Sequence, residues 1–175
     1  MFPWYRVGLF STLLLFGCSP PRDAFAPQCP SAKLLLPLAD ITRYAGPAPH
    51  DVTDLILQAR VVAVSGSCQA GDDPSKVPVV AKVSISLQRG PAMKGREAEV
   101  PVFVLIAEGN VVWDKKVFPL HFTFPPNVDR LTVTSPEIDM EFPVSSQKTA
   151  AAYNVIAGFQ LTPDELAVNR QGGGG

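Results

Sequence analysis

The chain has 175 residues and a formal net charge of −1, and 46% of its residues are hydrophobic. This length and apolar content suit one globular domain with a buried core. A nucleic-acid-binding protein needs clustered positive charge, so the near-neutral balance leads us to expect no nucleic-acid partner.

The first residues have the pattern of a secretory signal peptide. Arg6 precedes an apolar run over residues 7–17. This run is only about half as long as the ~20 apolar residues that cross a bilayer as a helix. A short charged region followed by such a run is typical of a cleaved leader. We therefore exclude residues 1–17 from the folded domain.

The leader ends in Leu15-Phe16-Gly17-Cys18, which resembles the bacterial lipobox. The resemblance implies a diacylglycerol group on the Cys18 sulfur, cleavage before this residue and acylation of the new amino terminus. Three acyl chains exceed what stable membrane anchoring requires. The alternative is an ordinary signal peptide with a cysteine present by chance. Because Ser19 rather than Asp follows Cys18, analogy with other bacteria favours the outer membrane, with the domain facing the periplasm.

Residues 18–28 are expected to form an acylated, proline-rich tether, because proline fixes φ and removes backbone donors. Two cysteines remain, Cys29 and Cys68, and in an oxidising compartment they predict a disulfide. Free thiols or a metal pair are the alternatives, but no CxxC or Cys/His spacing favours metal. The bridge would close a loop of roughly 40 residues and would add about 4 kcal/mol in the chain-entropy description.

Residues 29–170 are predicted to form one all-β domain, because apolar and polar side chains alternate with period 2. The sequence contains about seven such segments with short Pro/Gly turns and no helices between them. This pattern favours an antiparallel β-sandwich, immunoglobulin- or fibronectin-like in architecture, with a small barrel as the alternative. The predicted strands cover residues 33–38, 55–64, 77–88, 99–107, 111–124, 130–144 and 152–161.

One face of each long strand is apolar and should point into the core. The predicted inward residues are Val77, Val79, Ala81, Val83, Ile85, Leu87, Phe118, Leu120, Phe122, Phe124, Ile138, Met140, Phe142, Tyr153, Val155, Ala157, Phe159 and Leu161. Glu108-Gly109-Asn110 indicates a tight turn between two strands. Pro78, Pro101 and Pro119 weaken the strand assignment at their positions, since proline is confined to edges, strand starts or bulges.

One short helix is predicted near the C-terminus. Thr162 is a suitable N-cap, Pro163 suits the first helical position, and Glu165 completes a capping box. Leu161 and Leu166 are spaced as a hydrophobic staple. The helix should end near Asn169, and residues 171–175 are expected to be a flexible tail.

Three segments together resemble a family of uncharacterised alphaproteobacterial envelope lipoproteins. They are Cys-Pro-Ser-Ala-Lys-Leu-Leu at residues 29–35, Ser-Gly-Ser-Cys at 65–68, and Gly-Phe-Gln-Leu-Thr-Pro-Asp-Glu-Leu at 158–166. The resemblance covers most of the mature chain. It supports the envelope assignment and implies no reaction.

Few residues suggest a chemical site. A copper-type site would require His50 and His121 to converge with Met93 or Met140, and we expect surface histidines instead. Glu137, Asp139 and Glu141 lie on one predicted strand face. Alternate strand residues are roughly 7 Å apart, too far for one strand to surround a calcium ion. We therefore expect a solvated acidic face, and no bound metal.

Arg89, Lys94 and Arg96 form a basic turn that could meet anionic headgroups, although a solvated loop is the simpler interpretation. The chain contains no G-x-S-x-G motif, no P-loop and no dinucleotide fingerprint. We expect no catalytic residues, no cofactor and no enzymatic activity. The favoured function is a non-catalytic binding or assembly module, anchored to the membrane by its acyl chains, with an envelope protein as partner. A periplasmic carrier of a small ligand or metal is the alternative, and a hydrolase is the weakest hypothesis.

Overall fold

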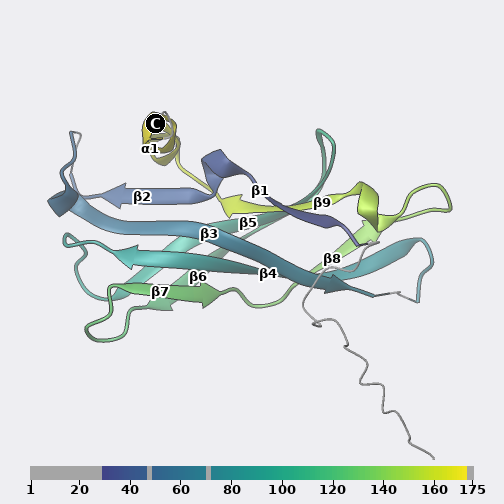
Figure 1. Cartoon of the computed structure of the whole chain (residues 1–175), viewed down its shortest axis with the longest axis horizontal. Helices are drawn as coiled ribbons and strands as arrows, with labels where there is room; N and C mark the ends of the chain where they lie inside the picture. Colours follow the sequence, from purple (N-terminus) through teal and green to yellow (C-terminus); the bar gives the residue numbers. More distant parts are fainter. Residues whose placement is uncertain (1–28, 47–48, 70–71, 173–175) are drawn as a thin grey trace, which may run out of the picture.

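Two β-sheets lie face to face in the computed structural model, which describes residues 29–46, 49–69 and 72–172 (Figure 1). One sheet has four strands, in the order β1 (Ser31–Leu34), β9 (Asn154–Phe159), β5 (Glu97–Glu108) and β6 (Val111–Thr123). The other has five strands: β2 (Asp40–Tyr44), β3 (Leu55–Cys68), β4 (Lys76–Arg89) and β7 (Arg130–Thr134) lie in a row, and β8 (Ile138–Pro143) also pairs with β4. The predicted all-β sandwich with one short C-terminal helix is therefore confirmed.

The described residues form nine strands, where the sequence predicted about seven. The segment 33–38 was only partly predicted correctly, because the chain leaves β1 and makes a 3₁₀ turn that contains Pro37. The strand after this turn was missed altogether. Three 3₁₀ turns, η1 (Leu36–Leu38), η2 (Val52–Asp54) and η3 (Ala150–Ala152), and the helix α1 (Pro163–Gly172) complete the fold.

The predicted strand 130–144 divides into β7 and β8, which pair with different halves of β4. Ser135 lies at the division and is buried. Its backbone N–H donates to the Val83 carbonyl, and its hydroxyl accepts from the Val83 N–H and donates to the Pro136 carbonyl. The break therefore leaves the edge of β4 hydrogen-bonded at the point where one partner strand replaces the other.

The core lies between the sheets and is made by the residues that the alternation predicted. All of the predicted inward side chains are buried or half-buried, and only Val77, Phe118 and Leu161 are half-buried. Met93, from the loop after β4, also lies in this core. Burial of these aliphatic and aromatic side chains is the main force that holds the sheets together.

The three strand prolines lie at the ends of strand pairings or at the edge of a sheet. The last β5–β9 pair is Val102 with Phe159, so Pro101 lies one residue past the end of β9 and its carbonyl accepts from the Gln160 N–H. Pro78 likewise lies one residue past the last β3–β4 pair, and its carbonyl accepts from the Gln69 N–H. Pro119 is in β6, at the edge of its sheet. The strands continue through these prolines because proline is tolerated at the end of a strand pairing and on an edge strand.

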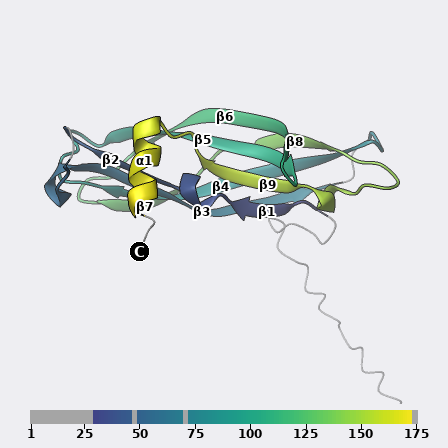
Figure 2. The same cartoon turned by 90° about the horizontal axis from the view of Figure 1, so that it is seen from above.

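The C-terminal helix begins where the capping box predicted it. The Glu165 N–H donates to the Thr162 hydroxyl at 3.2 Å, and the Thr162 N–H donates to the Glu165 carboxylate at 2.9 Å. The helix continues to Gly172, past the predicted end at Asn169 and into the expected tail. Figure 2 shows α1 lying across one long edge of the sandwich, from one sheet to the other. No helix in the described part of the chain has the length and apolar character needed to cross a membrane.

Candidate functional site: a polar groove beside the C-terminal helix

The predicted disulfide is present. Cys29 and Cys68 are bridged, with their Cα atoms 6.0 Å apart. The bridge joins Cys29, two residues before β1, to the last residue of β3, so it connects the start of the described chain to the five-stranded sheet. The expected lipidation site, Cys18, lies outside the described residues, as does the rest of the predicted leader and tether.

The two histidines lie on different elements with different partners. The His50 ring stacks on Tyr44, with ring centroids 4.4 Å apart. His121 is exposed on β6, as the alternation predicted, and its Nδ1 lies 3.2 Å from the Glu99 carboxylate. Both Met93 and Met140 are buried in the hydrophobic core. The structure therefore does not bring the histidines and methionines of the copper hypothesis together.

The predicted acidic stripe faces outward beside basic residues of β4. Glu137 pairs with Lys82 at 3.2 Å, and Glu141 pairs with Lys76 at 2.8 Å. The Lys76–Glu141 hydrogen bond raises the pKa of the lysine above its ordinary value. Neighbouring strands thus supply the counter-charges for this face.

The basic turn is only partly solvated. Lys94 and Arg96 are exposed. Arg89 folds back instead, with its guanidinium 3.7 Å from the Asp129 carboxylate and within 3.5 Å of the Met93 carbonyl. One of the three basic side chains is therefore engaged with the adjoining loops.

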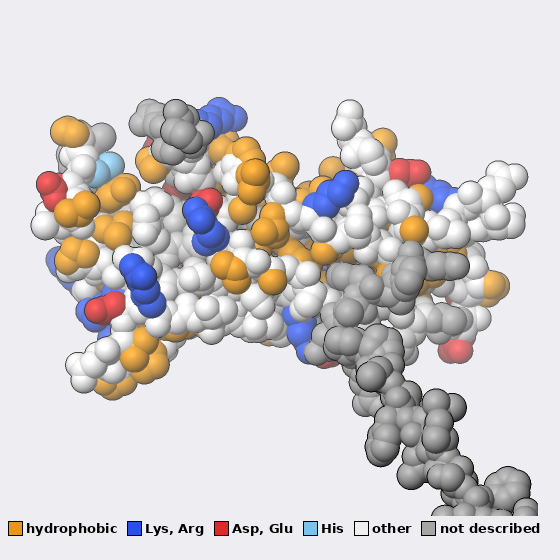
Figure 3. All heavy atoms as spheres, viewed as in Figure 1, with side chains coloured by type: hydrophobic (Ala, Val, Ile, Leu, Met, Phe, Trp, Pro, Cys, Tyr) orange, Lys and Arg blue, Asp and Glu red, His pale blue; other side chains and the backbone are white. Residues whose placement is uncertain are grey.

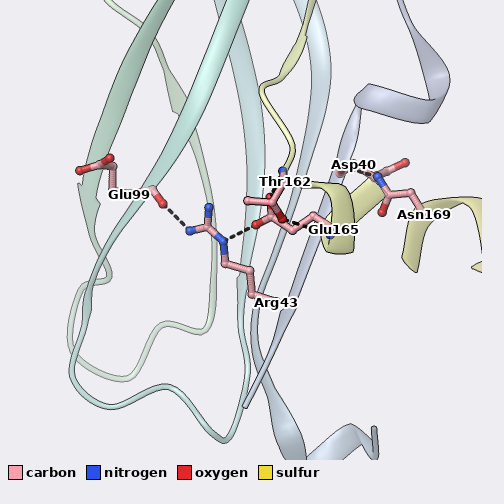
Figure 4. A network of polar contacts seen from close by, with 6 residues as sticks. All are labelled: Asp40, Arg43, Glu99, Thr162, Glu165 and Asn169. Carbon is pink, nitrogen blue, oxygen red and sulfur yellow. Dashed lines mark hydrogen bonds and ion pairs between the residues drawn. The ribbon is translucent and has the colours of Figure 1, made fainter. Parts of the chain in front are cut away.

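Arg43 joins three elements at the edge of the sandwich (Figure 4). Its Nε donates to the Glu165 carboxylate of α1 at 2.8 Å, and its Nη1 donates to the Glu99 carbonyl of β5 at 2.7 Å. Because β9 ends at Phe159, the Glu99 carbonyl lies past the β5–β9 pairing, and Arg43 supplies its donor. The half-buried guanidinium therefore links both sheets and the helix.

The last turns of α1 cover the outer edge of β2. The Asn169 side-chain amide donates to the Asp40 carbonyl at 2.6 Å and to the Pro37 carbonyl at 3.1 Å (Figure 4). These bonds satisfy backbone oxygens that an uncovered sheet edge would expose. Arg43 at one end of the helix and Asn169 at the other hold α1 in a fixed position on the sandwich.

The docked helix forms one wall of a groove of about 900 Å³. This volume is at the upper end of the range for small-molecule sites. The floor is the outer face of β2, β3 and β4, and the walls come from η1 and the end of α1. We call this hollow the α1 groove; its lining residues are Leu36, Pro37, Asp40, Ile41, Thr42, Tyr44, Gln58, Ala59, Arg60, Ser86, Gln88, Val168, Asn169 and Arg170.

Uncharged polar side chains form most of the exposed floor. In one cross-strand row, Thr42 lies opposite Gln58, and Gln58 lies opposite Gln88. Ser86 belongs to the adjacent row. None of these four side chains makes a hydrogen bond within the part of the chain that the structure describes. The floor therefore offers hydroxyl and carboxamide groups, each both donor and acceptor, to whatever fills the groove.

The charges of the groove nearly balance. Asp40 and Arg60 form an ion pair across β2 and β3, and the Asp40 carboxylate raises the pKa of Arg60. Arg170 adds one positive charge at the end of α1. In Figure 3 the sheet face below α1 is largely white, the colour of uncharged polar side chains and backbone, with charged groups dispersed over it. Such a surface suits a ligand with little net charge.

Tyr44 provides an aromatic surface at one end of the groove. Its ring lies almost parallel to His50, with an interplanar angle of 4°. The stacking fixes the orientation of the phenol ring, and Tyr44 lines the groove. The site therefore combines a polar floor with one oriented aromatic ring.

A second cluster lies where β5 turns into β6. The Glu108 carboxylate accepts hydrogen bonds from the Trp113 indole at 3.2 Å and from the Lys148 ammonium. The Lys148 nitrogen also lies 4.6 Å from the centre of the Trp113 ring and 4.4 Å from that of Tyr153. The bond from Lys148 lowers the pKa of Glu108, and Glu108 in turn raises the pKa of Lys148. These four residues, Glu108, Trp113, Lys148 and Tyr153, form what we call the Trp113 cluster, and they fix the half-exposed side chain of Trp113.

The free edge of β6 is closed to strand addition over part of its length. The Lys115 N–H donates to the side chain of Asp114 at 2.8 Å, so it points away from β5 and is already occupied. Pro119, four residues later on the same side of the strand, has no N–H. A partner strand would therefore find two donor positions of this edge unavailable.

Sequence reasoning missed both the α1 groove and the Trp113 cluster. The alternation Asp40-Ile41-Thr42-Arg43 in a short polar segment was the available signal for β2. Neither the contact of α1 with this strand nor the place of Lys148 beside Trp113 follows from local pattern. No protein-family model, curated protein or solved structure matches the chain.

Proposed function

We propose that this protein is a lipid-anchored protein of the bacterial cell envelope and a non-catalytic binding module whose ligand occupies the α1 groove. The observation that carries the binding role is the row Thr42, Gln58 and Gln88, whose polar groups face the groove without hydrogen-bond partners among the described residues. The anchor is supported by the lipobox-like Leu15–Cys18 and by the Cys29–Cys68 disulfide, which is typical of proteins outside the cytoplasm.

The chemistry of the groove favours a neutral oligosaccharide as the ligand. Sugar hydroxyls are both donors and acceptors, and so are the carboxamides and hydroxyls of the floor. The oriented Tyr44 ring suits the apolar face of a sugar ring, and the nearly balanced charges disfavour a highly charged ligand. An extended peptide would instead pair with a free sheet edge, whereas the floor of this groove is a sheet face.

Calorimetric titration with a neutral oligosaccharide tests the binding site. Purified protein is titrated with chitotetraose and cellotetraose, after a glycan array has covered further envelope sugars. We expect binding that the Gln58→Ala/Gln88→Ala double variant weakens at least about tenfold, because each lost hydrogen bond contributes about 1 kcal/mol.

The matched control is Ser84→Ala. Ser84 lies on the same outer sheet face, where its hydroxyl is 3.2 Å from that of Thr134, and it does not line the groove. This variant should bind as the wild type does. If the Gln58→Ala/Gln88→Ala variant binds as tightly as the wild type, or if the wild type binds no glycan on the array, the oligosaccharide proposal is overturned.

Replacement of Cys18 tests the anchor independently. The Cys18→Ser variant should remain unprocessed and lack incorporated palmitate, whereas the wild-type protein should be labelled and recovered with the outer-membrane fraction. Processing of the variant at the same bond, with retention in the membrane, would refute lipid attachment at this residue. The envelope-protein partner expected from the sequence stays a prediction, which crosslinking in the native envelope would test.

A further inference from the structure

The start of β6, directly after the turn from β5, exposes three consecutive apolar residues. Val111, Val112 and Trp113 have 58%, 56% and 51% of their surface exposed. We call these three residues the hairpin tip. Three consecutive large apolar side chains exposed at the end of a hairpin are solvated poorly by water, and such concentrations of apolar surface mark interaction sites. Figure 1 shows this turn, in teal at the top of the view, standing clear of the sandwich.

The hairpin tip is held in place by its neighbours. Gly109 has φ of 56° at the first position of the two-residue turn, as a type II′ hairpin turn requires. The register shift after Ile106 leaves Trp113 without a partner on β5. The ring instead packs edge-on against buried Tyr153, and its N–H is bonded to Glu108. The exposed side of the indole is therefore a fixed surface.

The chain enters the fold beside the base of this hairpin. Asn154 lies between Ser31 on β1 and Ala107 on β5. Adjacent strands are about 4.8 Å apart, so Ser31 and Ala107 are separated by about 10 Å. Cys29 precedes Ser31 by two residues, and its disulfide fixes this point to β3. The segment that links Cys18 to the fold therefore arrives at the hairpin end of the molecule.

The length of that segment brings the hairpin tip within reach of an anchored bilayer. The stretch from Cys18 to Cys29 spans at most about 40 Å when fully extended. Val52 is equally apolar and 79% exposed, but it precedes β3, whose other end carries Cys68. Because β3 has 14 residues, Val52 lies roughly 45 Å from the Cys29–Cys68 bridge. Of these two exposed apolar sites, only the hairpin tip is on the tethered side.

We infer that the hairpin tip rests in the headgroup region of the phospholipid bilayer to which Cys18 is attached, and thereby orients the domain on the membrane. This inference rests on the lipid anchor of the proposed function. Tryptophan is enriched at membrane interfaces, where its ring is partly apolar and its N–H remains hydrogen-bonded. The two valines would enter the boundary of the acyl chains, and the α1 groove would remain open to solvent.

The protein carries its own probe for this contact. The two tryptophans of the chain are Trp4 and Trp113, and cleavage before Cys18 removes Trp4. Acylated mature protein is reconstituted into phosphatidylcholine vesicles whose acyl chains are either unmodified or brominated near the headgroup. We expect the Trp113 emission to shift to the blue on reconstitution and to be roughly twofold weaker with brominated lipid.

Two variants make the test specific. Val111→Ser/Val112→Ser should reduce both the blue shift and the quenching, whereas Val52→Ser, an equivalent change at the far end, should leave both unchanged. Protein that floats with vesicles without quenching of Trp113 would overturn the contact and leave the anchor intact. Failure to float would refute the anchor and, with it, this inference. A blue shift that grows with protein concentration, without quenching by brominated lipid, would show that the hairpin tip contacts a second copy of the protein. That result would overturn the inference.

Discussion

Arg43 of β2 and Glu165 of α1 are 122 residues apart in the chain, yet their side chains form an ion pair of 2.8 Å at the edge of the sandwich. Glu165 also closes the capping box by accepting from the Thr162 N–H. The Glu165 carboxylate therefore caps the N-terminus of the helix and, through Arg43, attaches the helix to both sheets. The position of α1, and with it one wall of the groove, depends on this side chain.

Replacement of Glu165 by Ala should lower the free energy of unfolding by about 1–3 kcal/mol, since the ion pair and half of the capping box are lost together. Urea denaturation followed by circular dichroism measures the change. The neighbouring Asp164 is exposed in the same first turn. Asp164→Ala should lose only the interaction with the helix dipole, about 0.5 kcal/mol. Equal losses in the two variants would show that the contact with Arg43 contributes nothing.

Gly90 is required because of the close approach of another strand. A Cβ at this position would lie 2.0 Å from the Leu55 carbonyl oxygen, whose position is fixed by the bond from the Ala92 N–H. Gly90→Ala should therefore lower the free energy of unfolding by about 3 kcal/mol or more, or prevent folding. Lys94→Ala, in the same loop, is the control, because the Lys94 side chain is exposed. Thermal unfolding should show a large fall in Tm for the first variant and a small one for the second.

Protonation of the Glu108 carboxylate at acidic pH should weaken the hydrogen bonds that hold the Trp113 cluster together. The hydrogen bond from Lys148 lowers the pKa of Glu108 below its ordinary value of 4.5. A carboxylate with a lowered pKa stabilises the fold above pH 4.5, and this contribution is lost as the pH falls below 4.5 through the folded-state pKa. Because the Trp113 indole donates to Glu108, its fluorescence should change in the same acidic window.

The Glu108→Gln variant should lack that fluorescence step, since glutamine does not titrate. Glu137→Gln, which changes a carboxylate paired with Lys82 on the other sheet, should retain it. A step of unchanged size in Glu108→Gln would assign the titration to another group.

The edge of β6 should become self-associating when its outward N–H groups are freed. Asp114→Ala releases the Lys115 N–H, and Pro119→Val adds a donor on the same side of the strand. We expect the double variant to form a concentration-dependent dimer, measured by sedimentation velocity, because an open edge pairs with other strands. Lys115→Ala changes the charge of the edge but keeps its N–H bonded to Asp114, so it should remain monomeric whenever the wild type does. If the double variant also stays monomeric, these two residues do not protect the edge.

Local pattern was sufficient for the long strands, because their interior faces are continuous. The alternation from Val77 to Leu87 and the aromatic face from Phe118 to Phe124 predicted which side chains are buried. The capping box at Thr162 was equally local. The disulfide followed from counting the cysteines and from the expectation of an oxidising compartment.

The candidate site could not be predicted in the same way, because it is made by contacts between distant segments. Arg43 belongs to a five-residue strand, and its partner Glu165 lies in a helix more than a hundred residues later. The groove floor consists of ordinary outward-facing residues such as Gln58 and Gln88, which become a site only when α1 docks beside them. Trp113 points toward Tyr153 because a bulge breaks the alternation that the sequence displays.

The bridge between Cys29 and Cys68 also determines how the domain would respond to a mechanical pull from its N-terminal side. Without it, tension would be carried by β1 alone, a four-residue strand that a force could peel away one bond at a time. The covalent link passes the load to the end of β3, whose 14 residues pair along β4. Force then acts along two long central strands in shear, so that many backbone bonds resist rupture simultaneously.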